Sequence, residues 1–198
     1  MCRDGYTPMS VAWVASSPSS SWTSLIAPMS DFAFCPRCAA PLIDKRVDGE
    51  PRRACSAGCG FVHYDNPVPV VAAVVEHEGH VVLARNRAWP QTWYGLITGF
   101  LERGEAPGQG AIREVKEELG LDATRATLIG VYTFERMNQV IIAYHVPAAG
   151  AITLNEELVD YRRVPPEQCY AWHSGTGHAL RDWLRSRGFD PPVVERPR

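Results

Sequence analysis

The stretch of sequence that decides the fold reads GFLERGEAPGQGAIREVKEELGL and runs from Gly99 to Leu121. Its second half, residues 107–119, has helical spacing and is followed by Gly120, a common residue at the C-terminal end of a helix. The apolar residues of this half fall in one sector. They predict a helix that packs on a core through Ala111, Ile112, Val115 and Leu119.

Three glutamates share another side of this helix, because offsets of three and four residues return to the same face. They are Glu114, Glu117 and Glu118. Their charges repel one another unless a cation lies among them, and Arg113, four residues before Glu117, relieves only part of that repulsion. Glu105 in the preceding loop adds a fourth carboxylate.

This acidic cluster predicts a site for a hard divalent cation. Mg²⁺ and Mn²⁺ prefer oxygen ligands and commonly bind through a few carboxylates together with substrate phosphates. The alternative is a solvated acidic face, which is the usual explanation for acidic residues on a helix. The loop before the helix favours the metal site, because its glycines permit close backbone approach and positive φ angles beside the acids. These are Gly99, Gly104, Gly108 and Gly110.

The fixed positions of this stretch resemble the Nudix box: a glycine, five residues, a glutamate, seven residues, and then Arg-Glu-apolar-x-Glu-Glu-x-Gly-apolar. The resemblance implies an α+β fold, an α/β/α sandwich, and hydrolysis of a nucleoside diphosphate linked to another group with Mg²⁺ or Mn²⁺, releasing a nucleoside monophosphate. By position, it implies that Glu114, Glu117 and Glu118 bind metal and that one of them acts as base. It also implies that Arg113 and Glu105 orient the loop and the helix.

The resemblance further implies metal ligands outside the glutamate helix. The carbonyl of Gly99 is expected to complete a metal site. Another acidic ligand often comes from outside the box, and Glu156, Glu157 and Asp160 are the candidates here. Nothing in their spacing selects one of the three.

Four cysteines form two close pairs, Cys35-Pro-Arg-Cys38 and Cys55-Ser-Ala-Gly-Cys59, separated by sixteen residues. Four thiolates suit tetrahedral Zn²⁺, and a closed shell of four cysteines leaves no open position for catalysis, so the role is structural. The module is similar to a zinc ribbon, although its second pair has three intervening residues where two are usual. His63 is a candidate substitute ligand, and a surface histidine is the alternative.

A zinc ribbon directly before a Nudix domain resembles the NADH pyrophosphatase branch and the related ADP-ribose and FAD pyrophosphatases. The substrate type is therefore ADP-ribose, FAD or NAD(H). The NADH-specific branch carries Ser-Gln-Pro-Trp-Pro-Phe-Pro after the box, whereas residues 130–139 here read GVYTFERMNQ. This departure favours ADP-ribose or FAD over a strict preference for NADH.

The chain is expected to divide into a disordered extension (residues 1–31), a zinc ribbon (32–66), a Nudix domain (67–188) and a C-terminal tail (189–198). Met29 is an alternative translation start. Within the domain, residues 68–76 and 80–86 predict a hairpin, and residues 127–134 and 140–146 a second pair of strands. Further strands are expected at residues 94–100 and 161–164, and a second helix at residues 177–187.

Composition sets limits on other functions. The net charge of −2 provides no overall basic field, so nucleic acid binding is not favoured, although a local patch remains an option. The longest apolar run, Val70 to Val75, is too short to cross a bilayer, and the N-terminus lacks a secretory signal core. We therefore expect a cytoplasmic protein that acts on a nucleotide-type small molecule without a membrane partner, with a homodimer as one option.

Two weaker signals concern binding. Trp89 and Trp93 flank Pro90 in a loop and are candidates to stack on a nucleobase, with core packing as the alternative. A basic cluster in the ribbon supports a second hypothesis, in which the ribbon binds RNA or a protein and the substrate includes nucleotide-capped RNA. The alternative is a solvated face made by Lys45, Arg46, Arg52 and Arg53.

Overall fold

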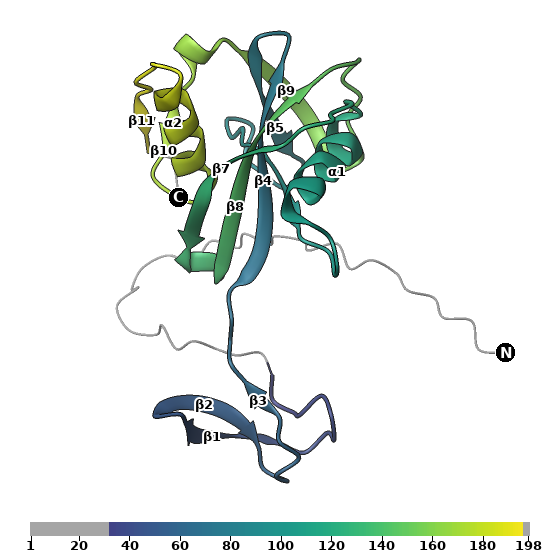
Figure 1. Ribbon diagram of the computed structural model, residues 1–198, viewed down its shortest axis with the longest axis vertical. Helices are drawn as coiled ribbons and strands as arrows, with labels where there is room; N and C mark the ends of the chain where they lie inside the picture. The colour runs from purple at the N-terminus through teal and green to yellow at the C-terminus, as the bar shows by residue number, and fades with distance from the viewer. Residues whose placement is uncertain (1–31, 196–198) are drawn as a thin grey trace, which may run out of the picture. The chain divides into compact units, whose positions relative to one another are not determined.

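The computed structural model describes residues 32–195, which divide into two compact units between Asn66 and Pro67 (Figure 1). The predicted disordered extension and the alternative start at Met29 lie outside the described residues, as do the last three residues of the predicted tail. Within the described part, neither helix has the length and apolar character needed to cross a bilayer.

Residues 32–66 form a small antiparallel sheet with the order β1-β2-β3. Its strands are β1 (Leu42–Val47), β2 (Glu50–Cys55) and β3 (Val62–His63). Asp48 and Gly49 connect β1 to β2 with φ angles of 53° and 85°, and two positive φ angles are what a two-residue type I′ hairpin turn requires. The buried core of this unit is small and consists of Leu42, Cys35 and Cys55.

In residues 67–195, six strands form a mixed sheet with the order β7-β8-β4-β5-β9, and β6 pairs with β4 beside this path. The pairing of β4 with β8 is parallel, and the other pairings are antiparallel. Two further short strands, β10 and β11, pair in parallel. The strands are β4 (Val68–His77), β5 (His80–Asn86), β6 (Ile97–Phe100), β7 (Thr127–Phe134), β8 (Gln139–Ala148), β9 (Leu158–Val164), β10 (Ala171–Trp172) and β11 (Val193–Val194).

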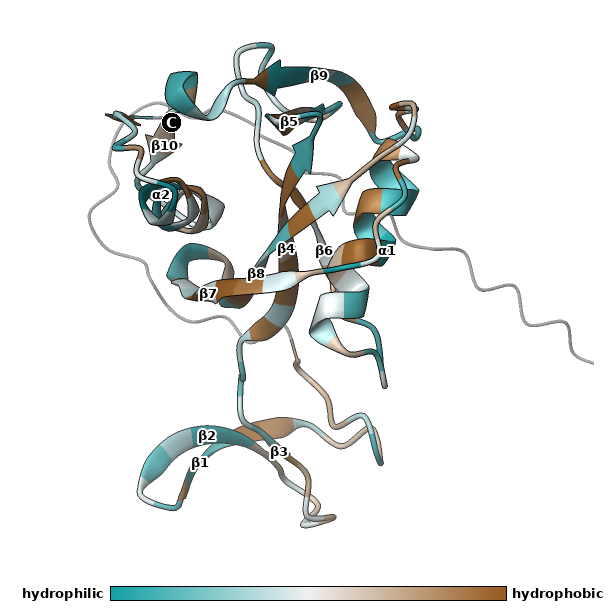
Figure 2. Cartoon of the chain, turned by 45° about the horizontal axis from the view of Figure 1, so that its top comes forward, coloured by the Kyte–Doolittle hydropathy of each residue, from teal (hydrophilic) through white to brown (hydrophobic). Residues whose placement is uncertain are grey.

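The helices α1 (Pro107–Leu119) and α2 (Thr176–Ser186) cover opposite faces of the mixed sheet (Figures 1 and 2). The short 3-10 helices η1 (Glu135–Met137) and η2 (Pro166–Gln168) lie in connections. The predicted α/β/α sandwich is therefore confirmed. The glutamate helix α1 forms one outer layer of the sandwich, and the C-terminal helix α2 forms the other.

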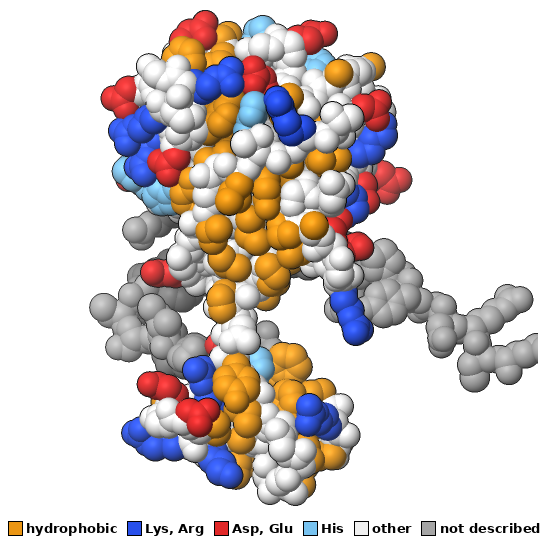
Figure 3. Space-filling model, viewed as in Figure 1, with side chains coloured by type: hydrophobic (Ala, Val, Ile, Leu, Met, Phe, Trp, Pro, Cys, Tyr) orange, Lys and Arg blue, Asp and Glu red, His pale blue; other side chains and the backbone are white. Residues whose placement is uncertain are grey.

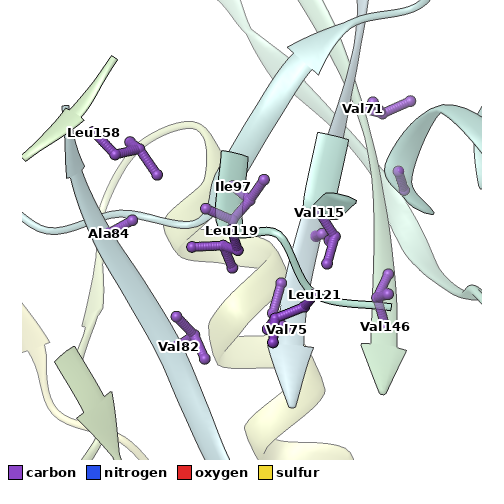
Figure 4. Close-up of a cluster of buried hydrophobic side chains, with 12 residues drawn as sticks. Val71, Val75, Val82, Ala84, Ile97, Val115, Leu119, Leu121, Val146 and Leu158 are labelled. Atoms are coloured by element: carbon purple, nitrogen blue, oxygen red, sulfur yellow. The ribbon is translucent and has the colours of Figure 1, made fainter. Parts of the chain in front are cut away.

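The central strand β4 explains why both faces need a helix. Side chains alternate along a strand, so Val71 and Val75 pack with α1 whereas Ala72 and Val74 lie in the core on the α2 side. Figure 4 shows side chains of the core cluster on the α1 side, which includes Val71, Val75 and the helix residue Val115. A strand buried on both faces reads as a continuous apolar run in the sequence.

Most predicted elements are present. The hairpin of β4 and β5, the pair of β7 and β8, and the helix over residues 107–119 are confirmed. The strand expected over residues 94–100 begins only at Ile97, because Gly95 makes an isolated bridge to Ala84 instead of joining the ladder. The strand expected at residues 161–164 begins earlier, at Leu158. β11 was not predicted, and it shows that the predicted tail contributes a strand.

Candidate active site

The helix α1 presents its acids because of how its ends and its apolar side are placed. Pro107 occupies the first turn, where a missing N–H costs nothing, and Gly120 ends the helix in the left-handed region with φ 70°. Val115 and Leu119 are fully buried against the sheet. The glutamates lie outside this apolar sector, where Glu117 is exposed and Glu114 and Glu118 are half-buried.

Arg113 is the hydrogen-bonding centre of the cluster. Its guanidinium binds Glu105 with two hydrogen bonds, from Nε to Oε1 at 2.9 Å and from the second terminal nitrogen to Oε2 at 3.1 Å. The other terminal nitrogen donates to Glu114 at 2.7 Å and to Glu117 at 2.9 Å. A last bond reaches the carbonyl of Phe100 at 3.1 Å, so one side chain ties the loop, β6 and the helix together.

The electrostatics separate Glu105 from the helix glutamates. Hydrogen bonding to Arg113 lowers the pKa of Glu105, whereas burial raises the pKa of Glu114 in spite of its bond to Arg113. Burial also raises the pKa of Glu118 from 4.5 to about 8, and the charges of Glu114, Glu157 and Glu117 add to this effect. Among residues 32–195, no hydrogen bond or ion pair joins the Glu118 side chain to a protein cation.

Two of the four loop glycines make room for these carboxylates. A Cβ atom on Gly99 would lie 1.8 Å from Oε1 of Glu114, and one on Gly110 would lie 2.8 Å from Oε2 of Glu105. The expectation of positive φ angles is correct only for Gly104, at 82°. Gly108 has no positive φ angle, and it is not needed for close approach because an added Cβ would make only ordinary contacts.

The structure separates the three candidate acids outside the box. The negative charge of Glu157 acts on Glu118 and raises its pKa. Asp160 instead accepts a short hydrogen bond from the hydroxyl of Tyr94, which lowers the pKa of Asp160. The backbone carbonyl of Glu156 accepts two hydrogen bonds from the Arg87 guanidinium. Only Glu157 is therefore electrostatically coupled to the helix glutamates.

The predicted aromatic residues lie in the loop after β5 and are half-buried. This loop adjoins the acidic segment, because the backbone N–H of Arg87 donates to the carbonyl of Glu157 at 2.8 Å. Sequence reasoning missed Phe100, which is 54% exposed and whose carbonyl accepts a bond from Arg113. Hydrophobic side chains gather on the visible surface of this unit (Figure 3). Val131 on β7 is 60% exposed.

Two cavities of the described part lie elsewhere. One of about 330 Å³ is lined by His145, Trp183 and neighbouring residues of β7 and α2. The other, of about 370 Å³, is lined by Arg136, His173, His178 and their neighbours. Neither includes a glutamate of α1. The carboxylates of α1 nevertheless form the candidate active site, because phosphates and metal ions are bound by charge and donor geometry rather than by enclosure.

The ribbon holds a second group of candidate ligands. The sulfur atoms of Cys35 and Cys59 are 3.5 Å apart and those of Cys38 and Cys55 are 3.4 Å apart, and all four lie within 4.8 Å of one another. A tetrahedral shell with Zn–S bonds of about 2.3 Å requires S–S distances of about 3.8 Å. The four sulfurs therefore fit a tetrahedral metal.

The unusual spacing of the second cysteine pair does not prevent this convergence. Gly58 and Gly60 adopt φ angles of 71° and 85°, which only glycine adopts without strain, and they turn the chain on both sides of Cys59. His63 is not part of the group, because its ring packs on Phe32 and its Nε2 atom faces Asp65 at 3.6 Å. Within residues 32–195, no set of three acidic side chains reaches the same convergence.

A family model described as NUDIX domain matches residues 66–184, the span of the sheet and both helices. The chain therefore belongs to the Nudix family, as its box predicted. It is similar to the NAD-capped RNA hydrolase NudC of Stutzerimonas stutzeri (strain A1501), with 29% identity over 136 residues, 68% of this chain and 48% of that protein.

Other relatives agree. The NAD-capped RNA hydrolase NudC of Mycobacterium bovis (strain BCG / Pasteur 1173P2) is 31% identical over 111 residues, 50% of this chain and 34% of that protein. The chain thus spans half or less of the length of these relatives. The crystal structure of a Nudix hydrolase from Nitrosomonas europaea superposes with a TM-score of 0.66 and 23% identity, covering 83% of this chain and all of the other, which supports the fold.

Proposed function

We propose that this protein hydrolyses the pyrophosphate linkage of a nucleoside diphosphate derivative with Mg²⁺ or Mn²⁺ and releases a nucleoside monophosphate. One observation carries the proposal: Glu118 is a half-buried carboxyl group beside Glu114, Glu117 and Glu157, and the Arg113 guanidinium in this cluster already donates to Glu105, Glu114 and Glu117. Such an excess of desolvated carboxyl groups suits a divalent cation better than a solvated surface.

The donor set fits a hard metal ion. Glu114, Glu117 and Glu118, together with the Gly99 carbonyl, would hold it, and all are oxygen ligands. When bound, Mg²⁺ or Mn²⁺ would neutralise phosphate charge and lower the pKa of a coordinated water. Arg113 and Glu105 would keep the loop and the helix in register through their paired hydrogen bonds.

Glu157 is our choice for the additional acidic residue. It is exposed, it comes from a different segment than the helix, and its charge raises the pKa of Glu118. A carboxylate in that position can bind metal or accept a proton from the attacking water. Its neighbour Glu156, which is equally exposed, provides a matched control.

Substrate recognition would use aromatic and apolar surfaces next to the acids. Phe100 is exposed directly after Gly99, and Trp89 lies in the loop that contacts the Glu157 backbone. An aromatic face stabilises a stacked base by about 1 to 3 kcal/mol. ADP-ribose, FAD and NAD(H) all offer an adenine ring, and NAD-capped RNA is the substrate in the names of the relatives.

The test is a substrate panel. The full chain with Mg²⁺ or Mn²⁺ should release AMP from at least one of ADP-ribose, FAD and NADH, measured by chromatography. Glu157→Gln should lower kcat about 10- to 100-fold, whereas Glu156→Gln should leave it unchanged. The absence of AMP release from every substrate would refute the proposal, and equal effects of the two variants would remove the role of Glu157.

We also propose that the four cysteines hold Zn²⁺ in a structural role. The convergence of the sulfurs and the small core of the ribbon support it, since a unit of this size needs a metal or a disulfide to fold. The closed shell of four thiolates would leave no position for a substrate. Elemental analysis should find one zinc per chain.

A further inference from the structure

The ribbon hairpin divides the basic cluster between its two faces. Side chains alternate along a strand, and in the register of β1 with β2, Asp44 lies opposite Arg53 whereas Lys45 lies opposite Arg52. Arg53 is engaged on its face, with Nε 3.8 Å from Asp44 and a hydrogen bond to the Leu42 carbonyl. Arg46 follows the same alternation as Asp44 and donates a hydrogen bond to the Gly49 carbonyl at 2.7 Å. Lys45 and Arg52, the other two cations of the cluster, share the opposite face.

This pairing of like charges is unfavourable by itself. Residues directly opposite in an antiparallel pair have Cβ atoms about 4.5 to 5.5 Å apart, and like charges at that distance destabilise the sheet. In the described part of the chain, no carboxylate forms an ion pair with Lys45 or Arg52. Glu50 lies on the same face, two residues before Arg52, but forms no ion pair with either cation, so an anionic partner would still relieve the repulsion.

The same face presents an aromatic ring and an apolar side chain. The Arg52 guanidinium lies over the Tyr64 ring, 5.6 Å from its centre, and donates a hydrogen bond to the Tyr64 carbonyl at 2.8 Å. Tyr64 is 47% exposed, and Ile43, which follows the same alternation as Lys45, is 48% exposed. We call Ile43, Lys45, Arg52 and Tyr64 the ribbon face. Figure 3 shows Lys and Arg side chains beside hydrophobic ones on the visible surface of the ribbon.

We propose that the ribbon face binds single-stranded nucleic acid. Cations beside an exposed ring match its repeating unit, since phosphates meet the cations and an unpaired base stacks on the ring. An acidic peptide would satisfy the charges but would leave Tyr64 without a partner of matching shape.

The test measures binding of fluorescently labelled 12-nucleotide single-stranded RNA and DNA to the full chain by anisotropy at several salt concentrations. Lys45→Gln and Arg52→Gln should each weaken binding about 3- to 10-fold and flatten its salt dependence. Tyr64→Leu should weaken it about 5- to 100-fold through lost stacking. The matched control is Arg46→Gln, which removes the same charge from the opposite face and should have little effect. Zinc content and circular dichroism establish that each variant is folded.

Several outcomes would overturn the inference: no binding of either oligonucleotide, equal weakening by Arg46→Gln and Arg52→Gln, or competition by an acidic peptide as strong as by the oligonucleotide. Preference for RNA or equal binding of RNA and DNA would both support it and would identify which nucleic acid is bound. If the variants lose binding while the parent hydrolyses no substrate, the proposed function fails and the ribbon face stands. If hydrolysis of ADP-ribose is robust and oligonucleotide binding is unchanged in all variants, the proposed function stands and the role of the ribbon face fails.

Discussion

The chain carries two groups of candidate metal ligands, and they are prepared in different ways. The four cysteine sulfurs already lie within 4.8 Å of one another, in a unit with little core of its own. The glutamates lie on a helix fixed by fully buried residues, and a protein cation, Arg113, holds two of them. In the first group the ligands surround a centre, and in the second they surround an arginine.

Because of this difference, we expect the folding of the ribbon, but not the folding of the larger unit, to depend on bound metal. A cluster that converges in a small unit is expected to contribute its binding energy to folding. A cluster supported by a large core keeps its fold without metal, so its ions can exchange along with the substrate. The following predictions test this contrast, from the largest expected effect to the smallest.

Loss of the zinc site should unfold the ribbon alone. Cys38→Ser should remove bound zinc and abolish ordered structure in residues 32–66, because structural zinc contributes on the order of 10 kcal/mol to such modules. The larger unit should retain its thermal transition and its hydrolysis of small substrates within about twofold. NMR spectra and limited proteolysis would measure this. Collapse of both units, or survival of both, would contradict the contrast.

Neutralising the glutamates should affect chemistry and leave the fold intact. Glu118→Gln and Glu117→Gln should each lower kcat on the order of 10²- to 10³-fold, because a metal ligand is lost where substrate charge must be neutralised. Unchanged circular dichroism and weaker Mn²⁺ binding by calorimetry should accompany the loss. Glu135→Gln, on the exposed helix η1, serves as the control. Robust turnover by both site variants would count against a catalytic role for the cluster.

Gly99 should be required for its lack of a side chain. An added Cβ would lie 1.8 Å from Oε1 of Glu114, so Gly99→Ala must displace that carboxylate from Arg113. A displacement of about 1 Å can cost up to about 100-fold in rate, and we expect a 10- to 100-fold loss. Gly108→Ala, whose Cβ would meet its nearest atom at 3.5 Å, should be neutral. Equal kcat values for the two variants would show that the Glu114 carboxylate adapts freely.

The smallest effect concerns pH. In metal-free protein the pKa of Glu118 is raised to about 8, so the folded state binds this proton more tightly than the unfolded state. The free energy of unfolding should therefore fall as pH rises from about 4.5 to about 8, on the order of 2 kcal/mol after allowing for solvent access. Urea unfolding at pH 5 and pH 9 measures it, and Glu118→Gln should remove this part of the dependence. An identical fall in the variant would exclude Glu118 as its source.

The features that sequence reasoning predicted are those set by short-range spacing. The bounds of α1 and the shared side of its glutamates follow from residues a few positions apart, and the cysteine cluster was predicted from two pairs that are each close in sequence. The hairpin of β4 and β5 follows from its turn for the same reason. The predicted site roles of these residues, the cytoplasmic location and the homodimer stay predictions.

The features that it missed depend on contacts between distant segments. Nothing near β4 predicts its parallel pairing with β8, which begins at Val68 and Gln139. The coupling of Glu157 to Glu118 joins two segments across the fold, and spacing alone left three acids equivalent. The loop glycines were expected to permit close approach or positive φ angles, and only the fold decides which: Gly104 has a positive φ, whereas Gly99 and Gly110 make room for carboxylates.

The burial of β4 on both faces has a consequence for how the protein can vary. From Val70 to Val75 every side chain is at most 7% exposed, so no position in this run can drift to a polar residue without leaving a polar group buried and unpaired. Ordinary surface strands tolerate change at every second position. Mutational scanning of this segment should therefore show six adjacent intolerant positions instead of an alternating pattern.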